Sequence, residues 1–141
     1  MADQKGPSRT SFIVGRNLYK GFNHDQSRVE VLTGVDVEIG RGETVAVVGA
    51  SGIGKSTFLQ ILGALDPPDK GTLLLEDRDV YALGEADLAR LRNRYVGFVF
   101  QFHYLLPEFD ALENVMMPVL IGTGDREKAA KAAEEVLDRV G

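Results

Sequence analysis

The 141-residue chain contains no cysteine, and acidic residues outnumber basic ones, giving a net charge of −5. The lack of cysteine excludes disulfides and thiolate metal sites and fits a cytosolic protein. The acidic balance argues against nucleic acid as the main partner. No apolar run approaches the roughly 18 residues of a membrane span, and residues 1–7 are too polar for a signal peptide. The composition therefore predicts a globular protein that meets a membrane only through a partner.

One stretch carries most of the recognisable chemistry. It matches the phosphate-binding loop pattern G-x-x-x-x-G-K-[ST], between an apolar run at 44–48 and another at 58–62. Its residues are Gly49, Ala50, Ser51, Gly52, Ile53, Gly54, Lys55, Ser56 and Thr57. Glycines let successive N–H groups point at phosphate oxygens, and a helix beginning near Lys55 adds its positive end.

Two side chains of this loop have specific expected roles. Lys55 supplies an ammonium for the β- and γ-phosphates, and the Ser56 hydroxyl can ligate Mg²⁺. The alternative is a glycine-rich turn with a surface lysine. We expect the loop to bind a nucleoside triphosphate.

The remaining pattern predicts an α/β fold in which β-rich sequence precedes helices. The expected strands cover residues 11–22, 29–39 (with a bend or bulge at 33–34), 44–48, 72–75 and 96–100. One helix is expected to begin near residue 55, and three more are expected at 85–94, 111–121 and 126–140. Asp110 and Asp125 are the expected N-caps of the last two. Residues 1–10 are expected to form a flexible tail.

A phosphate-binding loop alone does not separate kinases, GTPases and transport ATPases. Three features together resemble the nucleotide-binding domain of ATP-binding-cassette (ABC) transporters, over about residues 11–141. They are Phe22 near the end of the first strand, the loop itself, and Gln101 directly after the apolar run 96–100. The resemblance implies a P-loop NTPase core with an antiparallel β subdomain in 11–100. The Gln loop and the beginning of a helical subdomain would follow in 101–141.

Two further stretches, 96–109 and 111–118, are similar to ATPase subunits of bacterial lipoprotein-releasing systems (the LolD type). That similarity implies an ATPase at the cytoplasmic face of the inner membrane, where ATP hydrolysis drives lipoprotein release. ATPases of macrolide-type exporters and of cell division are the alternatives within the family.

The resemblance also assigns roles to residues outside the loop. Phe22 would stack on adenine; the alternative is a core phenylalanine at a strand end. Gln101, like Lys55, would be catalytic, because it would approach Mg²⁺ and the attacking water. Residues Phe102–Leu106 would receive a short helix of a transmembrane permease, or could equally be ordinary core. A second copy of the domain would complete a homodimer that encloses two ATP molecules.

Several ABC motifs are absent from the sequence: the L-S-G-G-Q signature, the aspartate and glutamate after a second apolar run, and the switch histidine. The run Leu73–Asp77 resembles the apolar-acidic motif, but it follows the loop too closely and corresponds to a β-hairpin in the family. We therefore reject Glu76 as the catalytic base. We expect an N-terminal part of a longer protein, poorly stable and hydrolytically inactive alone.

Rival interpretations can be compared with the same sequence. A GTPase would need an N-K-x-D motif, which is absent. A small-molecule kinase would lack the segment around Gln101. A non-catalytic nucleotide-sensing module stays open as the alternative of another class.

Overall fold

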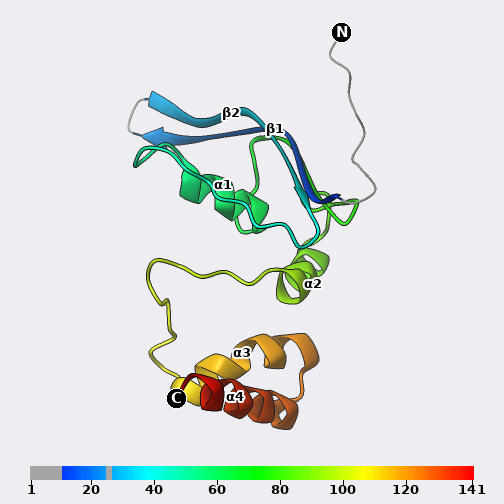
Figure 1. Cartoon of the computed structure of the whole chain (residues 1–141), viewed down its shortest axis with the longest axis vertical. Helices are drawn as coiled ribbons and strands as arrows, with labels where there is room; N and C mark the ends of the chain where they lie inside the picture. The colour runs from blue at the N-terminus through cyan, green and yellow to red at the C-terminus, as the bar shows by residue number, and fades with distance from the viewer. Residues whose placement is uncertain (1–10, 25–26) are drawn as a thin grey trace. The chain divides into compact units, whose positions relative to one another are not determined.

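The computed structural model describes residues 11–24 and 27–141, so the tail expected at 1–10 lies outside the described residues (Figure 1). The chain divides into two compact units between Leu88 and Ala89.

The first unit is built on a four-stranded antiparallel sheet with the order β2-β1-β3-β4. The strands are β1 (Ser11–His24), β2 (Ser27–Gly40), β3 (Lys70–Leu75) and β4 (Arg78–Asp79). Three of them confirm strands predicted from sequence, and β4 completes a short hairpin with β3.

A β-bulge interrupts β2 where the bend was predicted. Leu18 pairs with Val35 and Tyr19 pairs with Thr33, so Gly34 has no opposite residue. Gly34 has a φ of 80°, a left-handed conformation that glycine adopts without steric cost. The bulge lets one long strand follow the twist of its neighbour.

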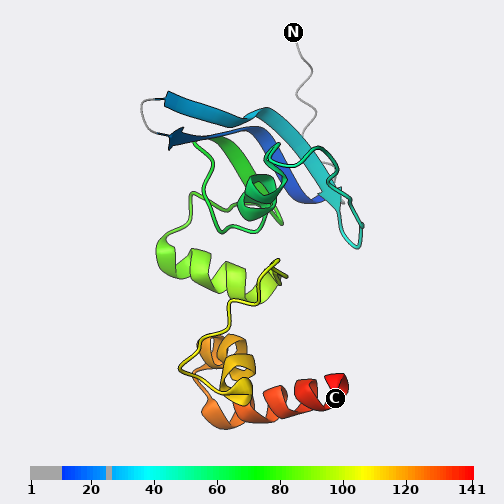
Figure 2. The same cartoon turned by 90° about the vertical axis from the view of Figure 1, so that its left-hand side faces the viewer.

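Helix α1 (Lys55–Leu62) begins at the residue predicted from the loop pattern and runs beneath the β1–β2 hairpin in both views (Figures 1 and 2). Its Ile61 is fully buried against Leu18 of β1 and Leu32 of β2. Burial of three branched side chains removes a substantial apolar area from water. This cluster fixes the helix, and with it the end of the phosphate-binding loop, to the sheet.

The second unit is helical. Helix α2 (Glu85–Tyr95) leads into it, and α3 (Ala111–Thr123) packs against α4 (Arg126–Val140) through Met116, Ala129 and Ala133. Both predicted caps are confirmed.

The cap of α3 is a complete capping box, in which Asp110 accepts from Glu113 N at 2.8 Å and Glu113 accepts from Asp110 N. Asp125 accepts from Lys128 N at 3.0 Å. No helix in the described part of the chain is long and apolar enough to span a membrane.

Two predicted strands do not form. Residues 44–48 and 96–100 have no regular secondary structure, and Val48 and Val99 are 86% and 96% exposed. The expectation that 96–100 is buried on both faces is therefore wrong for this structure. An extended segment becomes a strand only when a neighbour satisfies its N–H and C=O groups, and none of the four described strands pairs with either run.

The core cluster yields a stability prediction. Leu18→Ala removes a fully buried side chain and should lower the free energy of unfolding by about 2–5 kcal/mol, because it leaves a cavity between sheet and helix. Urea unfolding followed by circular dichroism measures this loss. Leu65→Ala, at a 40% exposed leucine, is the matched control and should cost far less. Equal losses in the two variants would contradict the assignment of Leu18 to the core.

Candidate nucleotide-binding site

A pocket of about 420 Å³ in the first unit brings the phosphate-binding loop together with Phe22. The hairpin contributes Phe22 and Val31. The loop and α1 contribute Ser51, Gly52, Gly54, Lys55, Ser56 and Thr57. Residues far apart in the sequence thus line one cavity, with an aromatic ring and a phosphate-type loop among its walls. Gly49, Ala50 and Ile53 belong to the loop but do not line the pocket, and Ile53 is 60% exposed.

The loop backbone reaches the helix through glycines with positive φ. Gly52 has a φ of 78°, and Gly54, the N-cap of α1, has a φ of 101°. No described side chain caps α1 at this end, and its first turn carries no acidic residue. The first N–H groups of a helix have no partners within the helix. Together with the positive end of the helix, they favour an anion at this point of the pocket.

The Lys55 side chain folds back over the loop. Its Nζ donates to the carbonyl oxygens of Gly49 at 2.9 Å and Ala50 at 2.7 Å. These neutral acceptors hold the ammonium at the loop, where a phosphate oxygen would offer a stronger, charge-assisted bond. A small rotation of the flexible Lys55 side chain would then suffice to move the ammonium from the carbonyls to the phosphate.

Ser56 is the first residue after this lysine, and its hydroxyl is an oxygen ligand of the kind that Mg²⁺ prefers. In the part of the chain that the structure describes, no group of three or more His, Cys, Asp or Glu side chains could hold a metal ion. The donor chemistry fits Mg²⁺ bound by one hydroxyl, nucleotide phosphates and water, and not a cage made by the protein alone.

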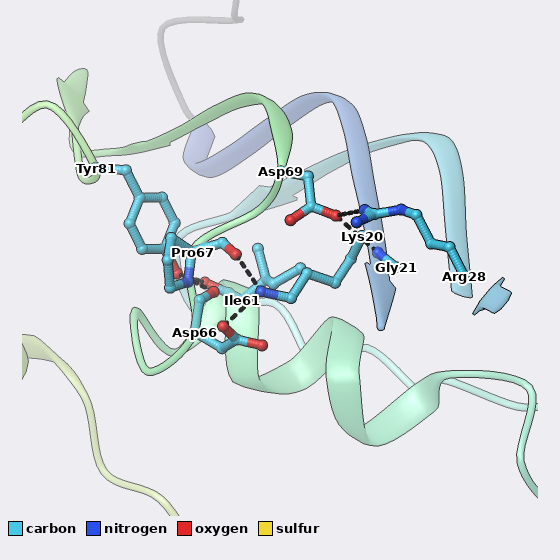
Figure 3. A network of polar contacts seen from close by, with 8 residues as sticks. All are labelled: Lys20, Gly21, Arg28, Ile61, Asp66, Pro67, Asp69 and Tyr81. Atoms are coloured by element: carbon cyan, nitrogen blue, oxygen red, sulfur yellow. Dashed lines mark hydrogen bonds and ion pairs between the residues drawn. The ribbon is translucent and has the colours of Figure 1, made fainter. Parts of the chain in front are cut away.

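A polar network that sequence reasoning missed holds Lys20 and Gly21, the two residues of β1 before Phe22 (Figure 3). Lys20 Nζ donates to Asp66 Oδ1 at 2.6 Å and to the carbonyl of Pro67 at 2.7 Å. The same ammonium lies 5.5 Å from the centre of the Phe22 ring, within cation–π range. The Lys20 side chain is only 10% exposed, so its charge needs these partners.

A second carboxylate holds the next residue of β1. Asp69 accepts a hydrogen bond from Gly21 N at 2.7 Å and pairs with Arg28 (Figure 3). The hydrogen bond from Gly21, with Arg28 beside it, lowers the pKa of Asp69 below its usual range. Glu30, then Asp69, raises the pKa of Arg28. The sequence offered one signal for this network, the two aspartates on either side of Pro67-Pro68. No nearby residue identified the partners of these aspartates.

Gln101 and the apolar residues after it belong to the second unit and do not line the pocket. They lie in a segment without regular secondary structure, and Phe102, Tyr104 and Leu105 are 63%, 69% and 63% exposed. Tyr104 meets Phe100 edge-on, with ring centres 5.1 Å apart. In the described chain these side chains form an exposed apolar surface and not a core.

Asn114 of α3 holds the far end of this segment. Its Oδ1 accepts from Leu106 N at 2.8 Å, and its Nδ2 donates to the carbonyls of Leu106 and Phe109 at 3.1 and 3.0 Å. One side chain thus orders the backbone next to the exposed surface. This role had no local signal in the sequence.

The β-hairpin expected at Leu73–Asp77, the run that resembles the apolar-acidic motif, is present. Glu76 and Asp77 form the turn between β3 and β4 with φ values of 48° and 62°, and Glu76 pairs with Arg41. Glu76 does not line the pocket, in agreement with its rejection as a catalytic base.

The loop glycines generate a paired prediction. An added Cβ at Gly52 meets nothing within 4 Å, whereas one at Gly54 would lie 2.5 Å from Val31 Cγ1. Gly52→Ala should therefore cost only backbone strain, about 1–2 kcal/mol. Gly54→Ala should cost more, because a steric clash is added. Urea unfolding of both variants, and of Gly54→Ala combined with Val31→Ala, measures the difference. Failure of Val31→Ala to recover any of the extra loss would show that the clash is not its cause.

Comparisons with known proteins agree with this geometry. The model of the family described as "ABC transporter" matches residues 32–141. The lipoprotein-releasing system ATP-binding protein LolD of Myxococcus xanthus (strain DK1622) is 52% identical over 126 residues, which cover 89% of this chain and 56% of the relative. LolD of Syntrophotalea carbinolica (strain DSM 2380) is 54% identical over 131 residues, covering 93% and 58%. The chain thus spans little more than half the length of these relatives.

The fold agrees as well. A solved dimeric structure of the ATP-binding cassette MJ0796, in a post-hydrolysis state with ADP and Pi, has a TM-score of 0.81 and 33% identity. The match covers 89% of this chain and 56% of that one. The architecture is therefore that of an α/β ABC cassette, present here as its antiparallel sheet, its phosphate-loop helix and the first helices that follow. The chain belongs to the ABC transporter family.

Proposed function

We propose that this chain is the nucleotide-binding part of an ABC ATPase that couples ATP hydrolysis to lipoprotein release from the bacterial inner membrane. The observation that carries the proposal is the pocket that combines Phe22 with Lys55 and Ser56. The lipoprotein assignment is supported by the names of relatives that are 52% and 54% identical to this chain over the matched residues.

Each wall of the pocket has a part in this function. Adenine stacks on Phe22, which is 44% exposed and so accessible. The loop N–H groups surround the phosphates, and Lys55 leaves the carbonyls of Gly49 and Ala50 for the β- and γ-phosphates. As water attacks the γ-phosphate in line, Lys55 and these N–H groups stabilise the developing charge.

Two residues complete the catalytic assignment. Ser56 would hold Mg²⁺, which would neutralise charge on the phosphate oxygens. In the complete protein, Gln101 would approach this ion and the attacking water and would respond to the membrane partner. The absent signature, apolar-acidic and switch-histidine motifs are needed for turnover, so the chain alone binds nucleotide without sustained hydrolysis.

The assembly follows from the same family pattern. Two copies close on two ATP molecules, in line with the dimeric state of the similar cassette MJ0796. In this proposal the β subdomain and the phosphate-binding core occupy residues 11–100. The Gln loop and the start of the helical subdomain lie in 101–141. The protein acts as a peripheral subunit at the cytoplasmic face of the membrane.

A transmembrane permease docks on Phe102–Leu106. Phe102, Tyr104 and Leu105 are each more than half exposed, and an apolar surface of this kind favours a protein partner. A short permease helix would cover the aromatic side chains and bury them from water.

Substitution of the loop lysine tests the catalytic proposal. Lys55→Ala should lower Mg-ATPase turnover by about 100-fold or more, because it removes a charge that stabilises the transition state. The assay uses the full-length gene product with its membrane partner. Lys131→Ala, at an exposed lysine of α4, is the control. Near-normal turnover in Lys55→Ala would refute the role of Lys55. Nucleotide binding without turnover in the unmodified protein would instead support the sensing module.

A second substitution tests the docking surface. Leu105→Asp places a charge on a 63% exposed leucine and should abolish co-purification with the permease, because a buried interface cannot solvate an unpaired carboxylate. Val140→Asp, at a 78% exposed valine of α4, is the matched control and should co-purify normally. Retention of the permease by Leu105→Asp would place the contact elsewhere on the protein.

A further inference from the structure

Phe22 stands close to the end of a hairpin, where nothing in the strand pairing alone fixes its ring. It pairs with Val29 only two pairs before His24 and Ser27, the last pair of the ladder. Strand ends of this kind fray readily. A ring that is 44% exposed gains little from core packing, so its position depends on how the preceding residues are held.

Both preceding residues are held by the segment that follows α1. Lys20 reaches Asp66 and Pro67, and Gly21 N donates to Asp69, as Figure 3 shows. Asp69 N also donates to the carbonyl of Tyr19 at 2.8 Å. Three successive residues of β1 are thus bonded to one short segment some 46–50 positions further along the chain.

The same segment is fixed to α1. Tyr81 Oη lies 2.8 Å from the carbonyl oxygens of both Ile61 and Asp66, so its one O–H is shared between them and joins the last turn of the helix to the residue that binds Lys20. Lys55 and Ser56 stand at the other end of this helix. An eight-residue helix is about 12 Å long and stiff on this scale. The helix and the network together set the spacing between the ring and the phosphate-binding loop.

The contacts are chemically specific and not merely polar. Lys20 is the one buried charged residue of the described chain, and loss of its acceptors would leave an unsatisfied ammonium. At Gly21, an added Cβ would lie 2.9 Å from Arg28 Nε and Nη2, so the absence of a side chain lets Arg28 reach Asp69. The ammonium also lies over the Phe22 ring.

We propose that Lys20 and Asp69 are positioning residues for nucleotide binding, which hold Phe22 at the correct distance from the phosphate-binding loop for the base. This inference rests on the proposed function, because it requires a nucleotide base on Phe22. Neither residue lines the pocket. Both act on the base half of the ligand and leave the phosphate half unchanged.

The experiment compares two ligands that share their phosphates. Isothermal titration of the full-length gene product measures the affinities of ADP and inorganic pyrophosphate with Mg²⁺. Lys20→Met and Asp69→Ala should each weaken ADP binding roughly 2- to 10-fold, the equivalent of one lost hydrogen bond, and leave pyrophosphate binding unchanged. Asp69→Asn keeps an oxygen acceptor for Gly21 N–H and should retain most of the ADP affinity. Lys131→Met is the matched lysine control.

A double substitution separates positioning from general stability. Phe22→Ala should weaken ADP roughly 5- to 100-fold by loss of stacking. Once the ring is gone, adding Lys20→Met should weaken ADP no further. If Lys20→Met lowers the melting temperature strongly, Asp66→Asn replaces it, because it removes the charge opposite Lys20 with little change of shape.

The outcomes are distinguishable. Equal losses for ADP and pyrophosphate, or no loss for ADP, would overturn the positioning role while Phe22 keeps its own. Additive losses in the double variant would also overturn it. If Phe22→Ala leaves the ratio of ADP to pyrophosphate affinity unchanged, then the proposed base contact itself is wrong.

Discussion

The apolar contact between the hairpin and α1 is the constraint on which the candidate site depends. Phe22 and Val31 come from the hairpin, whereas Lys55 and Ser56 come from the start of the helix. The pocket exists only while these two elements keep a fixed separation. Leu18, Leu32 and Ile61 supply that restraint near the far end of the helix, where they meet away from solvent. In the proposed function a nucleotide contacts both elements, so a few packed side chains would determine whether its base and its phosphates can bind together.

The apolar cluster holds α1 against the hairpin, and the polar network adds a directional restraint to that contact. Methyl groups pack in several ways at similar cost, but a buried ammonium with two acceptors has few satisfactory positions. Lys20 therefore restricts how the hairpin can shift along α1, and Asp69 restricts the backbone of the next residue. Burial of the Lys20 ammonium costs desolvation free energy, and its hydrogen bonds offset that cost only while both acceptors stay in place.

Features set by neighbours in sequence could be predicted, and those set by distant partners could not. The start of α1, the bulge at Gly34 and the caps Asp110 and Asp125 each follow from residues within a few positions. The resemblance to ABC proteins, and not local pattern, singled out Phe22 in the pocket. The runs 44–48 and 96–100 have strand composition, but hydrogen bonding to another strand decides the outcome. The Lys20–Asp66 contact joins residues 46 positions apart, and no periodicity encodes it.

In the exposed surface of the second unit, the backbone is ordered by the chain itself while the side chains stay exposed. Asn114 satisfies the backbone of Leu106 and the carbonyl of Phe109, so this end of the segment is ordered by the chain itself. The side chains of Phe102 and Tyr104, in contrast, remain largely in solvent. Backbone order without side-chain burial reduces the conformational entropy that a partner must remove on binding. A surface prepared in this way could use most of its apolar area for affinity, and this is the physical basis of the proposal that a permease helix docks there.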